Sequence, residues 1–175
     1  MFVKIKNIVI ILAVLLLPLN LFAENQENKD LKLFMGKWIE NCSSDSKTNK
    51  KKCSLERSVF IDQKMKKKIV TIIMQTESSS KDVRFILISP LGTLIQSGVK
   101  IGFDGKLVGE SAFGFNICEK IGCITSMMVK KQTLDLFRKS TDLNLEYIGA
   151  KGQKIQIKFS LDGFSKEFKK ITKIQ

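Results

Sequence analysis

Residues 142–161 read DLNLEYIGAKGQKIQIKFSL and show the clearest hairpin pattern in the chain. Apolar side chains alternate with polar ones in both of its halves: Leu143, Leu145 and Tyr147 in the first, and Ile155, Ile157, Phe159 and Leu161 in the second. Because successive side chains of a strand point to opposite faces, each half predicts a strand with one buried face. Residues 149–152 begin and end with glycine and supply the turn between the strands. The stretch therefore predicts a β-hairpin packed on an apolar core.

Shorter apolar or β-branched runs precede this hairpin, and polar or turn-forming residues separate them. We expect strands at 34–42, 53–61, 69–76, 83–88, within 94–103 and at 124–129, with a loop at 43–52 and a basic turn at 62–68. The dipeptide Asp104-Gly105 predicts a two-residue hairpin turn, because both of its residues tolerate positive φ. Residues 106–110 are expected to continue that hairpin.

The periodicity changes to that of a helix at two places. Leu134 and Phe137 lie three residues apart within 130–140, and Phe164, Phe168 and Ile171 are spaced i, i+4 and i+7. Asp162 is the expected N-cap of the second helix. About nine short strands with one or two short helices, and no βαβ alternation, predict an all-β protein built as an antiparallel β-sandwich.

The first 23 residues have the composition of a secretory signal peptide. Lys4 and Lys6 come first, an apolar run follows, and Ala23 ends it. The run is interrupted by Pro18 and Asn20 and is shorter than the roughly 20 residues that span a bilayer. We expect a flexible arm at 24–33 and a single domain at 34–175, long enough to bury a sizeable core. The mature protein is therefore expected outside the cytoplasm.

The four cysteines are Cys42, Cys53, Cys118 and Cys123. An even number in an oxidising compartment favours disulfides, and four cysteines allow three pairings. Spacing along the chain favours Cys42 with Cys53 and Cys118 with Cys123. A zinc site is the alternative, but it prefers C-x2-C pairs or accompanying histidine, and the chain has no histidine. We expect two structural disulfides, no free thiol and no metal site.

The chain is strongly basic, with a net charge of +13 at pH 7. Two groups of lysines are the candidate anion-binding residues: Lys47, Lys50, Lys51 and Lys52 in the first, and Lys64, Lys66, Lys67 and Lys68 in the second. Such groups attract anions through a field that is screened over about 10 Å in physiological salt. Outside the cytoplasm the expected anions are lipid headgroups, lipopolysaccharide or acidic glycans. The plainer interpretation is that lysine-rich loops keep the protein soluble.

No set of residues predicts an active site. Without histidine, the usual Ser/His/Asp and Cys/His arrangements are absent. A Ser–Lys pair and a facing pair of carboxylates remain open as alternatives, the latter drawn from Glu56, Asp62, Asp82, Asp104 and Glu110. Trp38, the single tryptophan, is expected in the core rather than on a ligand platform. We expect a non-enzymatic protein without a cofactor.

A series of motifs runs along the mature chain: Trp38-x3-Cys42 with Cys53, Pro90-x-Gly92 with Leu94 and Gly98, Asp104-Gly105, Cys118-x3-Gly122-Cys123, the Leu134/Phe137 helix, and Leu161-x-Gly163-Phe164. The series resembles the invasion-associated locus B (IalB) family of secreted bacterial proteins, from about Trp38 to Ile171. The resemblance implies an immunoglobulin-like β-sandwich in the periplasm, at the outer membrane or secreted from a Gram-negative bacterium. The family name refers to host-cell invasion. The shared positions are structural, so the resemblance carries over no functional residue.

These observations predict a secreted, non-enzymatic envelope protein that acts in host-cell invasion or envelope interaction through a basic surface. The expected partner is an unknown protein or an anionic envelope or host-surface ligand. Peripheral membrane association is expected, and nucleic acid binding is not. The alternative is a periplasmic accessory or chaperone-like subunit that pairs an exposed sheet edge with another envelope protein.

Overall fold

The computed structural model describes residues 32–173, with gaps at 45, 49, 78–81 and 110. Residues 31–175 form one compact unit. The expected signal peptide lies outside the described residues, and so does the expected arm except for its last two residues. None of the described helices is long and apolar enough to cross a membrane.

The described part of the chain contains eleven strands, two α-helices and one 3-10 turn. The strands are β1 (Phe34–Met35), β2 (Ile39–Ser44), β3 (Lys51–Phe60), β4 (Lys68–Glu77), β5 (Val83–Ser89), β6 (Val99–Phe103), β7 (Lys106–Leu107), β8 (Ile117–Glu119), β9 (Gly122–Val129), β10 (Asp142–Ile148) and β11 (Lys154–Ser160). The helices are α2 (Lys131–Lys139) and α3 (Phe164–Lys173), and the 3-10 turn is η3 (Ile95–Ser97).

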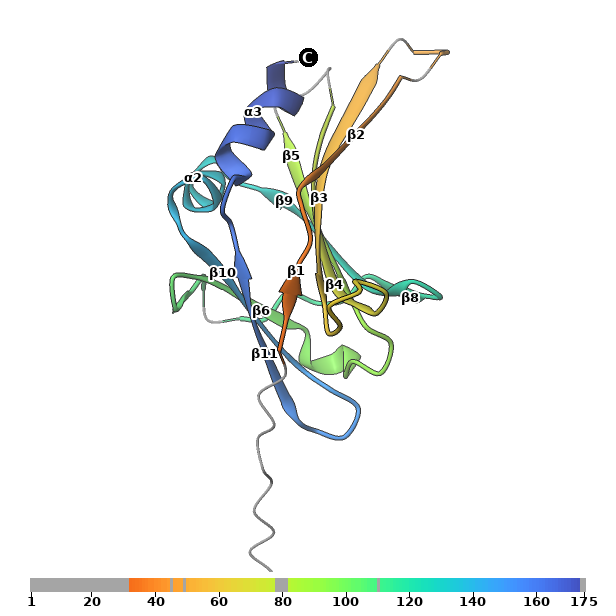
Figure 1. Ribbon diagram of the computed structural model, residues 1–175, viewed down its shortest axis with the longest axis vertical. Coiled ribbons are helices and arrows are strands. Elements are labelled where there is room, and N and C mark those ends of the chain that lie inside the picture. Colours follow the sequence, from red (N-terminus) through yellow and green to blue (C-terminus); the bar gives the residue numbers. More distant parts are fainter. Residues whose placement is uncertain (1–31, 45, 49, 78–81, 110, 174–175) are drawn as a thin grey trace, which may run out of the picture. The chain divides into compact units, whose positions relative to one another are not determined.

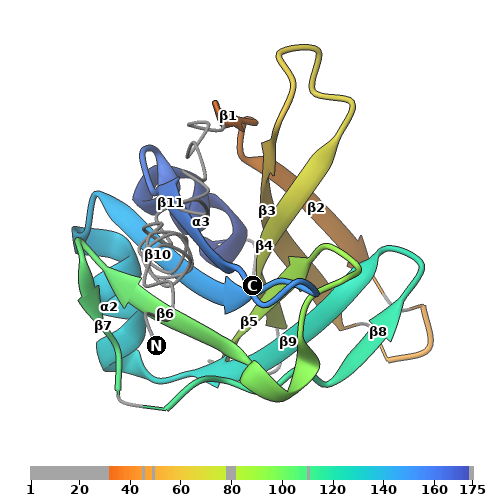
Figure 2. The same cartoon turned by 90° about the horizontal axis from the view of Figure 1, so that it is seen from below.

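The strands form two antiparallel sheets (Figure 1). In the larger sheet β1 and β2 both pair with β3, and the order continues through β4, β5, β9 and β8. The smaller sheet has the order β11-β10-β6-β7. Figure 2 shows the larger sheet on the right and the smaller sheet, with both helices, on the left. The predicted antiparallel β-sandwich is confirmed.

The core fills the space between the two sheets. In the predicted hairpin, Leu143 faces Phe159 and Leu145 faces Ile157, and all four side chains are buried. The larger sheet contributes further buried side chains: Leu55, Ile72, Met74, Phe85 and Leu87. Full burial of such a side chain stabilises the fold by about 1.5–3 kcal/mol. The alternation read from residues 142–161 therefore identifies the core-facing side of the smaller sheet.

Helix α3 closes one end of the sandwich with the three residues that predicted it. Phe164, Phe168 and Ile171 are buried in the core cluster. Trp38 is half-buried and packs on Phe164, with 5.4 Å between the ring centroids. Trp38 therefore packs against the core and stays partly exposed, so the core role predicted for it is confirmed only in part.

Arg57 closes the side of the sandwich where β3 approaches the end of β11. Its Nε donates to the carbonyl of Gly36 at 2.8 Å, and its Nη1 donates to the carbonyls of Ser160 at 2.9 Å and Asp162 at 3.1 Å. The guanidinium also lies 5.3 Å from the centre of the Trp38 ring. Burial lowers the pKa of Arg57, and the charge of Asp162 opposes that shift. Three segments distant in sequence are thus joined by one side chain.

Several predicted boundaries differ from the structure. The strand predicted at 34–42 is divided, because Met35 pairs with Val59 while Ile39 pairs with Glu56, which leaves one extra residue on the first strand. Such an extra residue is the geometry of a β-bulge. The loop predicted at 43–52 is shorter, since β2 extends to Ser44 and β3 begins at Lys51.

The predicted N-cap of the last helix is wrong. Gly163, with φ +77°, precedes α3, and its carbonyl accepts the first helical hydrogen bond from the N–H of Glu167 at 3.1 Å. Asp162 instead supplies its own carbonyl to Arg57 and Trp38. The hairpin turn at Asp104-Gly105 is confirmed, with φ values of +49° and +82°.

Candidate functional site

Both expected disulfides are present, and each ties an edge strand of the larger sheet to its inner neighbour. Cys42 and Cys53 face each other across β2 and β3, and Cys118 and Cys123 face each other across β8 and β9. Every residue of β2 is exposed and β8 has three residues, so burial does little to hold either strand. The disulfides compensate by restricting the unfolded chain. The described residues include no free cysteine.

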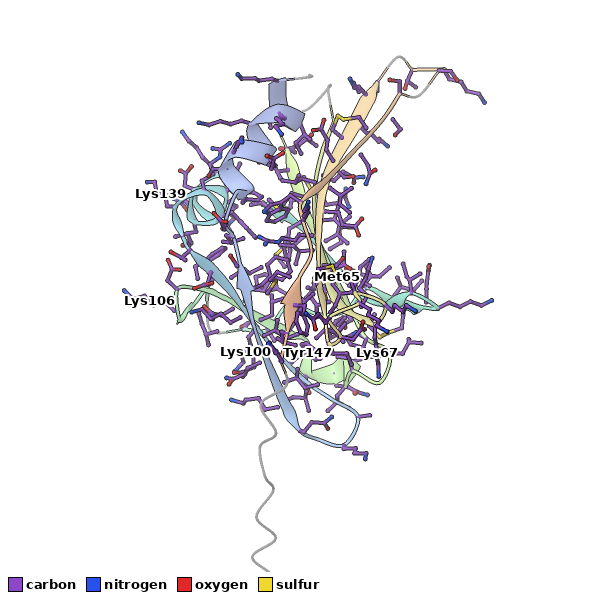
Figure 3. All side chains as sticks on the ribbon, in the orientation of Figure 1. Met65, Lys67, Lys100, Lys106, Lys139 and Tyr147 are labelled. Atoms are coloured by element: carbon purple, nitrogen blue, oxygen red, sulfur yellow. A yellow bond between two sulfur atoms is a disulfide. The ribbon has the colours of Figure 1, made fainter. Side chains whose placement is uncertain are left out.

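The two lysine groups predicted to bind anions lie at opposite ends of β3. The hairpin group, Lys47, Lys50, Lys51 and Lys52, surrounds the β2–β3 turn, and the loop group, Lys64, Lys66, Lys67 and Lys68, surrounds the β3–β4 turn. Lys51 and Lys52 begin β3, and the remaining eight residues of that strand, 53–60, separate the two groups, which is about 26 Å at 3.3 Å per residue. Figure 1 places the β2–β3 turn at the top, and Figure 3 labels Lys67 well below it. The structure does not bring the two groups into one patch.

The loop group is organised by a carboxylate. Asp62 accepts the backbone N–H of Lys66 at 3.0 Å and that of Lys67 at 2.6 Å. These two hydrogen bonds lower the pKa of Asp62. Lys68 in turn forms an ion pair with Glu56 at 3.4 Å. Two carboxylates therefore lie among these lysines and reduce the local positive charge.

A third group of lysines, missed by the sequence reasoning, covers the solvent face of α3. This helix group consists of Lys166, Lys169, Lys170 and Lys173, all exposed. Residues spaced three and four apart share one face of a helix, and this face is opposite the buried phenylalanines. Lys170 forms an ion pair with Glu167. The sequence could have predicted this group, because its lysines occupy the helix positions opposite the apolar residues whose spacing predicted the helix.

The helix group and the hairpin group lie at the same end of the domain. Helix α3 packs against β2 and β3, and Figure 1 shows the end of α3 and the β2–β3 turn both at the top, on opposite sides. The last-turn residues Lys170 and Lys173 also complement the helix dipole. This end, called the hairpin end below, carries eight lysines from the two groups.

An open hollow of about 520 Å³ borders the hairpin group on the outer face of the larger sheet. It is lined by Lys52, Gln75, Thr76, Asp82, Arg84, Ile86, Ser126 and Met128. Among these described residues, two cations and several neutral hydrogen-bonding groups outnumber the single carboxylate. Such a lining can hold an anionic group through charge-assisted hydrogen bonds.

Three of the five carboxylates considered for catalysis, Glu56, Asp62 and Asp104, have structural partners. The carboxylate of Asp104 accepts the N–H groups of Asp142 and Thr141, both at 3.0 Å, and chiefly the bond from Asp142 lowers the pKa of Asp104. A general acid in glycoside hydrolysis needs the opposite shift. Glu110 lies outside the described residues. In the part of the chain that the structure describes, no three metal-binding side chains gather.

Comparison with known proteins shows the family to which the chain belongs. A family model described as Invasion associated locus B (IalB) protein matches residues 38–172. The chain belongs to the IalB family. This IalB chain is also similar to the crystal structure of invasion associated protein B from Bartonella henselae, with a TM-score of 0.67 and 22% identity over 81% of this chain and 95% of that chain. The likeness to that structure shows the fold. No curated protein matches the chain.

The motif residues of this IalB protein have structural roles. The motif Cys118-x3-Gly122-Cys123 forms the β8–β9 hairpin and its disulfide. A side chain at Gly122 would meet the carbonyl oxygen of Ser89 at 2.2 Å, so the close approach of β9 to β5 requires glycine there. Together, the two disulfides and the family membership indicate an extracytoplasmic protein.

Proposed function

We propose that this IalB protein is a secreted, non-enzymatic envelope protein of a Gram-negative bacterium, in the periplasm or at the outer membrane, and that the hairpin end binds an anionic envelope or host-surface partner. The observation that carries the proposal is the placement of the hairpin group and the helix group at one end of the domain. The family membership and the β-sandwich favour a non-catalytic role in host-cell invasion or envelope interaction.

The chemistry of lysine suits a mobile anionic surface. Each lysine presents a strongly hydrated point charge on a flexible stem, which follows moving headgroups without fixed geometry. A basic residue near an anionic leaflet contributes about 1 kcal/mol. One group of four lysines then gives about 4 kcal/mol, near millimolar affinity, whereas both groups give about 8 kcal/mol, near micromolar affinity. Useful binding therefore depends on the two groups acting together.

Vesicle binding tests this proposal. Binding should require anionic lipid, be absent on neutral phosphatidylcholine, and fall as salt rises, because exposed charges are screened. The variant with Lys50, Lys51 and Lys52 changed to Ser should bind at least tenfold more weakly.

The loop group supplies a matched control. Changing Lys64, Lys66 and Lys67 to Ser removes the same charge at the opposite end of β3 and should weaken binding less than threefold. Equal losses in the two variants would mean that net charge alone attracts the protein, and an unchanged hairpin variant would end the proposal. Binding to heparin but not to vesicles would identify an acidic glycan as the partner instead.

A second candidate function is that of an accessory or chaperone-like subunit. Strand β2 forms an edge of the larger sheet that no described strand covers, and all of its residues are exposed. Ile39, which is 54% exposed, lies in register with Glu56 and Ile73 on the outer face of that sheet. An exposed edge of this kind can add a strand from another protein. A single stoichiometric protein captured from envelope extract, and lost in Asn41→Pro, would favour this role.

A further inference from the structure

An apolar cavity of about 290 Å³ lies between the sheets, on the side away from Trp38 and Arg57. It is lined by Phe85, Ile101, Val108, Gly109, Phe113, Met127, Met128, Val129, Lys130, Thr133 and Phe137. Three of these side chains, Phe85, Ile101 and Phe137, are buried and form its floor. The larger sheet, the smaller sheet and α2 all contribute to its walls.

The topology explains why the core is open at this place. Strand β7 has two residues, so the smaller sheet ends soon after Leu107. The chain then crosses toward the edge of the larger sheet, and Val108 and Phe113 only partly cover the gap. Phe113 is held by a bridge to Val99, with hydrogen bonds of 2.8 Å in both directions. The cavity thus has a fixed wall on one side and an open mouth.

The floor of the cavity is fixed by aromatic packing. The ring of Phe137 lies 5.4 Å from that of Phe85 and 4.8 Å from that of Phe103, between centroids. Rings in such contact hold one another in place. A cavity with rigid apolar walls is preorganised for an apolar group, because binding then costs little ordering of side chains.

The mouth of the cavity carries a positive charge. Lys130 stands at the start of α2, and among the described lining residues it is the only charged one. The first turn of α2 contains no acidic residue, and Thr133 adds a hydroxyl to the rim. An anionic group at the mouth would therefore find a cation without a competing carboxylate in the described lining.

We infer that this cavity binds the apolar tail of a single-chain anionic amphiphile, whose carboxylate pairs with Lys130. The volume sets the length of the tail. A cavity of about 150 Å³ holds a six-carbon ring, so 290 Å³ accommodates roughly twelve carbons. The inference is independent of the hairpin end, since none of the residues involved belongs to the hairpin group or the helix group.

Titration calorimetry with dodecanoate below its critical micelle concentration tests the inference. We expect saturable binding of one molecule per chain. Lys130→Glu should weaken it at least tenfold and should favour dodecyltrimethylammonium, which has the same tail and the opposite charge. Lys131→Glu, a neighbouring exposed lysine outside the cavity lining, should leave dodecanoate binding unchanged.

Filling the cavity gives a second test. Val108→Phe places a larger apolar side chain at the half-buried wall and should abolish binding of both amphiphiles while the circular dichroism spectrum stays the same. If Val108→Phe disturbs the fold, the comparison of Lys130→Glu with Lys131→Glu still tests the inference, because both lysines are exposed. Absence of saturable binding, or equal dodecanoate affinity in Lys130→Glu and the unaltered protein, overturns the inference.

Discussion

The indole Nε1 of Trp38 donates a hydrogen bond to the backbone carbonyl of Asp162 at 2.7 Å, across 124 positions of sequence. The same carbonyl also accepts from Arg57 at 3.1 Å. Because Trp38 stands between β1 and β2 and Asp162 stands between β11 and α3, this oxygen joins the edges of the two sheets. One side of the sandwich is thus closed by polar contacts, and the other side holds the apolar cavity.

Replacing Trp38 by Phe should destabilise the fold by about 2 kcal/mol. The variant loses a hydrogen bond worth about 1 kcal/mol and part of a ring that packs on Phe164. Urea unfolding followed by circular dichroism measures the change, since Trp38 is the only tryptophan and its fluorescence disappears with it. In a double-mutant cycle with Arg57→Lys, the shared carbonyl should give a coupling above about 0.5 kcal/mol. Simple additivity would show that the two contacts act independently.

Removing either disulfide should lower the free energy of unfolding, and the loss should be greater for the disulfide that closes the longer loop. The sequence separations are 11 for Cys42–Cys53 and 5 for Cys118–Cys123. Loop-closure entropy gives about 3 and about 2 kcal/mol respectively. The variant that lacks the Cys42–Cys53 disulfide should therefore unfold at a lower urea concentration than the variant that lacks the Cys118–Cys123 disulfide. Thiol titration of the denatured, unreduced protein should find no reactive cysteine, and two per chain would contradict the pairing.

The single tyrosine of the chain permits a direct titration of the core. Burial raises the pKa of Tyr147 to about 12, whereas an unperturbed tyrosine titrates near 10. Tyrosinate absorbance should therefore rise near pH 12 in the folded protein and near pH 10 in denaturant. Because the unfolded state loses its proton first, stability should fall as pH rises from about 10 to about 12. A folded-state midpoint near 10 would mean that the Tyr147 hydroxyl reaches solvent.

Features set by local periodicity could be predicted from the sequence. Alternation identified the β10–β11 hairpin, and the spacing of Phe164, Phe168 and Ile171 identified α3 and its buried face. The cysteine pairs could be predicted because each closes a short loop between neighbouring strands. In these cases the residues that interact are also close in sequence.

Features set by the order of strands could not be read in the same way. Nothing near Asp162 in the sequence indicates that its carbonyl meets Trp38, because that contact depends on where β11 lies relative to β3. The cavity likewise exists because β7 is short, so that only Val108 and Gly109 follow it along the cavity lined on another side by Met127 and Val129 of β9. The separation of the hairpin and loop groups was predictable, since a strand was expected at 53–61 between them.

Acid should weaken the fold partly through Asp104. Its carboxylate accepts two backbone N–H groups, and the bond from Asp142 is the main reason that the pKa of Asp104 is lowered. Because its pKa is lower in the folded state, ionised Asp104 contributes to the free energy of unfolding above the ordinary aspartate pKa of about 3.9. This stabilisation is lost as pH falls through the folded-state pKa. Asp104→Asn should therefore be less stable at pH 7 and show a flatter loss of stability below pH 4. Asp135→Asn, which removes a surface carboxylate paired with Arg138, serves as the control for net charge. Parallel pH profiles for Asp104→Asn and the unaltered protein would exclude this role.

Glycine is required at position 122 for two separate reasons. Its φ is +135°, and a Cβ would lie 2.2 Å from the carbonyl oxygen of Ser89 and 3.0 Å from the side chain of Ile88. Backbone strain and overpacking each cost about 1–3 kcal/mol, so Gly122→Ala should destabilise the fold by about 3 kcal/mol in urea unfolding. Gly114→Ala is the matched control, because nothing lies within 4 Å of its Cβ, and it should change stability by less than about 0.5 kcal/mol. Equal stability of the two glycine variants would mean that β9 can move away from β5 without cost.

Gly122 adjoins Cys123. When its disulfide is reduced, the Gly122→Ala variant should therefore lose the β8–β9 hairpin before the rest of the sheet, which hydrogen exchange at Ile117 and Ile124 would detect.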